Sequence, residues 1–214
     1  ARRIAEFPVT LKLGSTVFVH GGIVPRWARY GIERINRDVR DWLLGLTNEP
    51  DSALEARLDR YRMIGYGGGM LTVRAIKQQI DGALGSHGAW LLAPYTDLPT
   101  SSGLNLKPIP DFERTARIAI KHDFQVNTHA IGDRANREVL DVYERIFRDN
   151  PTKRDLRWRD EHAQHIDPSD VPRFKKLGVI ASMQGVHTIS DGPWVPKRLG
   201  DERARATSYL WRSL

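Results

Sequence analysis

From residue 71 onward, short apolar runs alternate with longer segments whose apolar residues recur every three or four positions. The short runs predict buried strands, and the longer period predicts helices that pack with one face. We expect strands at 71–76, 124–128, 156–162 and 179–184, and helices at 111–122, 134–148 and 168–177. Asp111 is the expected N-cap of the first of these helices. Strands that alternate with helices in this way favour parallel β/α units and therefore an α/β fold.

The first 60 residues have a different organisation. We expect a buried strand at 15–20, a helix at 32–44, and turn-forming stretches at 45–52 and 65–69. A domain boundary between the two turn-forming stretches, near Tyr61, divides the chain into residues 1–60 and 61–214.

Composition limits the kinds of site and partner that the chain can have. There is no cysteine, so a metal ion would have to bind His, Asp, Glu or a modified Lys. No apolar run reaches the roughly 18 residues of a membrane span, and no signal peptide is evident, so we expect a cytoplasmic protein. The net charge is +7, but the basic residues are interleaved with acidic ones, so we expect no nucleic-acid partner.

Three histidines come directly after successive predicted strands. They are His129, His162 and His187. In a β/α barrel the carboxyl ends of all strands open onto one face, so these side chains are expected to converge. Neutral imidazoles there can hold a divalent metal, which activates water and polarises a carbonyl or phosphoryl group. The alternative for each is an ordinary loop or core residue, which is our interpretation of His122 and His165.

Several motifs in the second part of the chain are specific to one family. They are DGALGS, NTHAIGDRANR, EHAQHIDPSD and, further on, HTISD. With their order along the chain, they make residues of about 62–214 resemble the YtcJ-like amidohydrolases, amidohydrolase family 3. The resemblance implies a hydrolase with a (β/α) TIM-type barrel that acts on amide or related C–N bonds of small molecules.

The same resemblance implies roles for individual residues. Lys77, which precedes DGALGS, corresponds to a metal ligand that is carboxylated. His129 of HAIGD and His162 of EHAQ correspond to two further ligands, and His187 and Asp191 would lie close to the substrate. The implied cofactor is a divalent metal, zinc, as one or two ions that activate water and hold the substrate's carbonyl oxygen.

The chain also departs from the family pattern. The early H-x-H pair and the late aspartate, the usual general base, are absent, so no catalytic residue is assigned. The match corresponds to about barrel strands four to seven, which predicts an incomplete parallel barrel. Smaller departures are His87 in place of arginine, Asp160 in place of an aliphatic residue, and Gly185 in place of proline.

Residues of about 10–60 resemble a different family. The stretch STVFVHGGIVPRWARYGIERINRDVRDWLLG is similar to part of the Shewanella-like branch of the PPP-type metallophosphatases. In that family the histidine of HGG, here His20, is a metal ligand. The other phosphatase motifs do not occur in the chain, and the alternative is a plain buried strand and turn. The two resemblances meet near residues 58–65, as in a fusion or chimera.

Three hypotheses follow. The first is a metal-dependent amidohydrolase, inactive if the chain is a fragment or chimera. The second is a metallophosphatase remnant that uses His20. The third is a non-catalytic β/α domain that completes a barrel with another chain, since the open edges of a partial barrel favour self-association.

Overall fold

The computed structural model describes residues 10–13, 16–19 and 51–214. The chain divides into two compact units, Ala1–Leu54 and Glu55–Leu214. In the first unit, β1 (Thr10–Leu13) and β2 (Thr16–Val19) form an antiparallel pair. The predicted strand at 15–20 corresponds to β2.

Two other predictions for the first part of the chain fall on positions that are not described. They are the helix at 32–44 and the alternative metal ligand His20.

A short antiparallel hairpin precedes the main sheet. The helix α4 (Asp51–Tyr61) comes first. The hairpin strands are β3 (Met63–Gly65) and β4 (Leu71–Val73), and α5 (Tyr66–Gly69) is the turn between them. Gly67 and Gly68 have φ of 65° and 71°, a conformation that other residues rarely adopt, so this turn requires glycine. The prediction of a single strand at 71–76 is wrong, because the strand is interrupted at Arg74. Its first half pairs with β3 and its second half joins the main sheet.

The main sheet has four parallel strands in the order β5-β6-β7-β8. They are β5 (Ala75–Gln79), β6 (Gln125–Ala130), β7 (Arg159–His162) and β8 (Ile180–Ser182). The parallel α/β fold is therefore confirmed. Within the described residues the sheet is open, with β5 and β8 at its edges, so these four strands do not themselves close a barrel.

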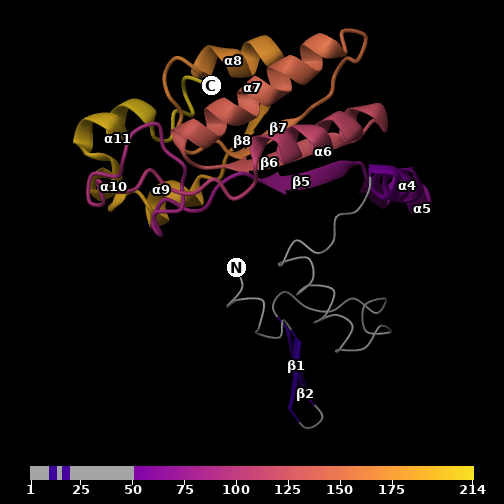
Figure 1. Ribbon diagram of the computed structural model, residues 1–214, viewed down its shortest axis with the longest axis horizontal. Coiled ribbons are helices and arrows are strands. Elements are labelled where there is room, and N and C mark those ends of the chain that lie inside the picture. The colour runs from indigo at the N-terminus through magenta and orange to yellow at the C-terminus, as the bar shows by residue number, and fades with distance from the viewer. Residues whose placement is uncertain (1–9, 14–15, 20–50) are drawn as a thin grey trace. The chain divides into compact units, whose positions relative to one another are not determined.

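Three helices cover one face of this sheet (Figure 1). They are α6 (Ile109–Lys121), α7 (Asp133–Asp149) and α8 (Val171–Leu177), which confirms the three predicted helices within a few residues. The predicted N-cap Asp111 is wrong. The N-cap is Pro108, because Pro110 fits the first turn, where a missing N–H breaks no helical hydrogen bond.

Alternation along β6 separates the two faces of the sheet. Val126, Thr128 and Ala130 are fully buried, whereas the residues between them, including His129, are only partly covered. The buried face packs against a cluster of aromatic side chains from α6, α7 and the residue before β7: Phe112, Tyr143, Phe147 and Trp158. This core faces the helices, so the opposite face of the sheet is left to carry the polar side chains.

A second apolar cluster lies beyond the carboxyl ends of the strands. It joins the loops after β5 and β6 to α10 (Val195–Leu199) and α11 (Asp201–Thr207). The sequence predicted neither of these short helices, nor α9 (Val186–Ser190) between β8 and α10 (Figure 1). The members of the cluster are Leu84, Ala89, Leu91, Tyr95, Ile131, Val195, Leu199 and Ala204. No helix in the described part of the chain has the length and apolarity needed to cross a membrane.

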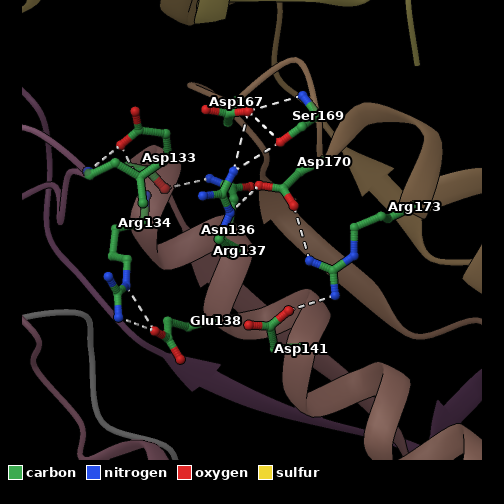
Figure 2. Close-up of polar contacts among 12 residues, drawn as sticks. Asp133, Arg134, Asn136, Arg137, Glu138, Asp141, Asp167, Ser169, Asp170 and Arg173 are labelled. Carbon is green, nitrogen blue, oxygen red and sulfur yellow. Dashed lines mark hydrogen bonds and ion pairs between the residues drawn. The ribbon is translucent and has the colours of Figure 1, made fainter.

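Ion pairs connect α7 to the loop that follows β7 and to α8 (Figure 2). Arg137 Nε donates to Asp170 Oδ2 at 2.7 Å, and Arg137 also lies 3.2 Å from Asp167. Arg173 donates to Asp170 at 3.0 Å and to Asp141 at 2.6 Å. Since Asp170 is buried, it is paired on both oxygens as a buried charge requires. The network holds in place the segment that leaves β7 just after His162.

Candidate metal centre

The structure brings the three predicted histidines together at the carboxyl ends of the strands. His129 lies on β6 and His162 ends β7, where Ala130 is its register partner. The ring centroids of His129 and His162 are 4.5 Å apart, and those of His162 and His187 are 5.5 Å apart, with both pairs edge to face. The convergence expected from strand order is therefore present.

Lys77 lies on the same face of the sheet, in the neighbouring strand. In the β5–β6 register Lys77 pairs with Asn127, and Gln79 pairs with His129. The positive charge of Lys77 contributes to lowering the pKa of both His129 and His162. Lys77 and the two histidines thus form one polar group.

His187 and Asp191 lie beside this group, in a setting that the sequence did not predict. His187 belongs to α9 rather than to a loop directly after the strand, and Asp191 is the C-cap of that helix. His187 Nδ1 is 3.8 Å from Asp191 Oδ2, one helical turn away. The Tyr209 hydroxyl donates to the His187 carbonyl at 3.0 Å, and Gln164 Nε2 donates to that hydroxyl at 3.2 Å. The C-terminal segment therefore holds α9 over the site.

Burial lowers the pKa values of the basic groups of the site. At His129 burial is the largest cause, and together with the nearby His162 and Lys77 it lowers the pKa of the ring to about 4. Burial is also the main cause that lowers the pKa of His162 and of Lys77, although Gln184 opposes it at His162. Metal ligands must be deprotonated, so these shifts favour metal binding.

We expect the His129 imidazole in the metal-free protein to titrate near pH 4 rather than near pH 6.5. The unfolded chain takes up this proton at higher pH, so the stability that His129 contributes is lost as pH falls from 6.5 towards 4. Proton NMR of the ring at successive pH values measures this midpoint, and the exposed ring of a short unfolded peptide serves as the reference. A midpoint near 6.5 would contradict the burial of this ring.

Two further residues contact the histidines, and the sequence reasoning assigned no role to either. Gln184 Oε1 lies 2.7 Å from His162 Nδ1 and orients that ring. Asp81 Oδ1 lies 3.5 Å from His129 Nε2. Asp81 is the aspartate of the DGALGS motif, so the motif itself was the available signal.

The residues present are of the types that bind a metal ion, but they supply only part of a ligand set. His129 Nε2 is buried without a hydrogen-bond partner, and both imidazoles favour the neutral form that binds metals. Among the residues that the structure describes, however, no three His, Cys, Asp or Glu side chains are grouped as a metal site. A third ligand from this group would have to be Lys77, whose amine gains oxygen ligands only by carboxylation.

A cavity of about 550 Å³ lies elsewhere, at the amino ends of β7 and β8. Its lining includes Phe147, Arg157, Lys176 and Ile180, and none of the predicted site residues. Active sites of β/α proteins lie at the opposite ends of the strands, so we place the candidate site at the histidines and not in this cavity.

Parallel β/α units with histidines gathered at the strand ends define the class as a parallel α/β protein whose candidate site lies where β/α proteins build their active sites. The chain belongs to the amidohydrolase family, whose sequence profile matches residues 24–214. This match includes part of the segment that resembles a phosphatase.

Relatives of known sequence agree with this family. The chain is 42% identical over 144 residues to Protein LONG AFTER FAR-RED 3 of Arabidopsis thaliana, covering 67% of this chain and 24% of that protein. It is 34% identical over 140 residues to the putative amidohydrolase YtcJ of Bacillus subtilis, covering 65% and 26%. A shorter similarity, 52% over 33 residues, links 15% of the chain to 8% of Shewanella-like protein phosphatase 2 of Arabidopsis thaliana.

Solved structures show the same relationship. An uncharacterized metal-dependent hydrolase from Pyrococcus furiosus superposes with a TM-score of 0.64 at 30% identity, covering 75% of this chain and 32% of that one. The corresponding hydrolase from Pyrococcus horikoshii OT3 gives the same TM-score and identity, with 76% and 32% covered. Apart from the phosphatase, the chain thus spans about a quarter to a third of the length of each of these proteins.

Proposed function

We propose that this chain carries the metal-binding part of a (β/α)-barrel hydrolase that acts on C–N bonds of amide-type small molecules. The observation that carries the proposal is the contact between His129 and His162, two neutral imidazoles whose rings lie 4.5 Å apart at the ends of adjacent parallel strands. Membership of the amidohydrolase family and the metal-dependent hydrolases among its structural relatives support it.

His129, His162 and a carboxylated Lys77 would hold the metal, which we propose to be zinc. A bound divalent metal would lower the pKa of water and polarise the carbonyl of the scissile amide. Burial lowers the pKa of the Lys77 amine, and a neutral amine is the form that reacts with carbon dioxide. One or two ions are compatible with this ligand set.

The remaining site residues act on the substrate side. His187 lies on α9 next to His162, and Asp191 is the C-cap of that helix, so the two can donate and accept hydrogen bonds to an amide. Gln184 Oε1 accepts a hydrogen bond from His162 Nδ1, and so holds the ring in place. No residue of the described chain is assigned as the general base.

Zinc content and zinc affinity of the purified chain test this proposal. We expect the wild-type chain to bind zinc and His129→Ala to abolish binding, because removing one of two imidazoles leaves too few neutral nitrogen donors. His122→Ala is the matched control, since His122 contacts Asp59 at the end of a helix and lies outside the site. A wild-type chain that binds no zinc, or equal binding by His129→Ala, contradicts the proposal.

Hydrolysis assays then separate the candidate reactions. Simple N-acyl and formamide substrates report amide hydrolysis, and p-nitrophenyl phosphate reports the phosphatase activity that the short N-terminal similarity suggests. Zinc-dependent turnover of the phosphate ester alone would favour the metallophosphatase alternative.

The open edges of the sheet also suggest a partner. Within the described residues β5 and β8 each have one unpaired edge, and unpaired edges favour pairing with another chain. We expect the purified chain to self-associate, which its mass in solution measures by light scattering. A strict monomer over the accessible concentration range would contradict this expectation.

A further inference from the structure

Asp81 is a fully buried carboxylate that joins two loops at the candidate site. It follows β5 directly and has no exposed surface. Its Oδ1 accepts the backbone N–H of Ile131 at 3.0 Å, and its Oδ2 accepts those of Gly132 at 2.8 Å and Trp90 at 2.9 Å. The carboxylate therefore ties the loop after β6 to the loop after β5.

The same carboxylate faces His129. His129 lies two residues before Ile131, and its Nε2 is 3.5 Å from Asp81 Oδ1. That nitrogen is buried and has no hydrogen-bond partner. Of the atoms around it, the Asp81 oxygen is the acceptor that an N–H on Nε2 would reach.

We infer that Asp81 is a positioning residue for His129: it anchors the strand end that carries this histidine and directs the ring's Nε2 N–H towards its own carboxylate. The inference rests on the proposed function, in which His129 binds the metal. With Nε2 occupied by a proton, Nδ1 is the ring nitrogen with a free electron pair.

The physical basis is the fixed orientation of an imidazole. A carboxylate that accepts the N–H of a ligand histidine sets its tautomer and its ring angle, and raises its basicity. The distance of 3.5 Å is longer than a hydrogen bond, and contacts of this kind shorten when the site is occupied. The three backbone hydrogen bonds hold Asp81 in place beforehand, so the carboxylate does not have to be ordered on binding.

Asp133 provides a matched control. It is also a buried carboxylate, and its Oδ1 accepts the backbone N–H of Leu92 at 2.8 Å and of Arg134 at 2.9 Å. It begins α7, at the end of the same loop, and within the described residues its carboxylate makes no hydrogen bond or ion pair to a histidine (Figure 2). Asp81→Asn and Asp133→Asn therefore both replace one oxygen of a buried carboxylate by an NH2 group and remove its negative charge, and only the first acts on His129.

The experiment measures the zinc affinity of the full chain by competition with a chromophoric chelator, and the melting temperature without metal. We expect both variants to melt at lower temperature, and Asp81→Asn alone to bind zinc about 10- to 100-fold more weakly. If both variants keep wild-type affinity, or lose it equally, Asp81 is only a loop anchor and the inference is overturned. If wild type binds no zinc, or His129→Ala binds as well, the proposed function itself fails.

A measurement on the wild-type chain covers the case in which Asp81→Asn does not fold. Nitrogen-15 NMR of the histidine rings in the metal-free protein reports which nitrogen of His129 carries the proton. The inference requires the proton on Nε2. A ring protonated mainly on Nδ1 overturns it.

Discussion

Replacing Gly132 by alanine is expected to lower the free energy of unfolding by about 3 kcal/mol or more. A Cβ atom on Gly132 would lie 2.0 Å from the Trp90 carbonyl oxygen and 2.6 Å from its carbon. These are backbone atoms, and the neighbouring N–H groups of the same loops are held by Asp81, so neither loop can move aside. Chemical denaturation of both proteins measures the difference.

Gly185→Ala is the matched control for this substitution. Gly185 has a helical backbone, and an added Cβ would meet the Trp211 ring at 3.6 Å, an ordinary contact. We expect its free energy of unfolding to stay within about 0.5 kcal/mol of wild type. A Gly132→Ala protein as stable as Gly185→Ala would mean that the loops at His129 are not packed as the structure has them.

Replacing Asp160 by valine is expected to stabilise the protein by about 1–3 kcal/mol at neutral pH. Asp160 is fully buried on β7, and neither carboxylate oxygen has a hydrogen-bond partner. The register partner of Asp160 is Thr128. The Thr128 hydroxyl lies 2.7 Å from the Tyr143 hydroxyl and bonds to it instead of to Asp160. Valine removes the unpaired polar group and restores the aliphatic character that the family pattern has here.

The gain from Asp160→Val should grow as pH rises. Burial raises the pKa of Asp160 well above its ordinary value, and the charges of Asp81 and Glu161 raise it further. Below about pH 4 the carboxyl is protonated in both the folded and the unfolded chain. Above that pH the unfolded chain releases the proton and the folded chain retains it, so wild-type stability is lost as pH rises. Denaturation at pH 4 and pH 8 measures this dependence.

Asp160→Asn separates the effect of the unpaired polar group from the effect of carboxyl titration. It removes the carboxyl titration but keeps an unpaired polar group, so we expect a smaller gain without this pH dependence. Equal stability of the valine variant and wild type at pH 8 would show that Asp160 finds a partner or water that the structure does not show.

Much of the fold followed from local patterns. The period of apolar residues predicted α6, α7 and α8 because each helix must bury one face, and the short apolar runs predicted the parallel strands between them. Local patterns failed where tertiary contacts decide the structure. Arg74 divides a continuous run of strand-forming residues because β3 competes with β6 as a pairing partner. Of the three short helices after β8, α10 and α11 pack against the loop after β5 in one apolar cluster, so their packing depends on contacts between distant parts of the chain.

For the candidate site too, the sequence predicted some features and left others untested. Strand order placed His129, His162 and His187 at one edge, and the structure brings their rings together. The motifs around them indicated the amidohydrolase family, which the family match confirms. The roles of Lys77, His129 and His162 as metal ligands stay predictions. So do the substrate-binding roles of His187 and Asp191.

The sequence by itself determined the α/β class, the family and the strand ends at which the histidines lie, because these depend on the order and periodicity of residues along the chain. Only the tertiary structure decided which groups surround those histidines. Asp81 and His129 are 48 positions apart in the chain and meet only because β5 and β6 pair in parallel register. The burial that lowers the pKa of His129, and the backbone N–H groups that hold Asp81, likewise exist only once the loops pack together.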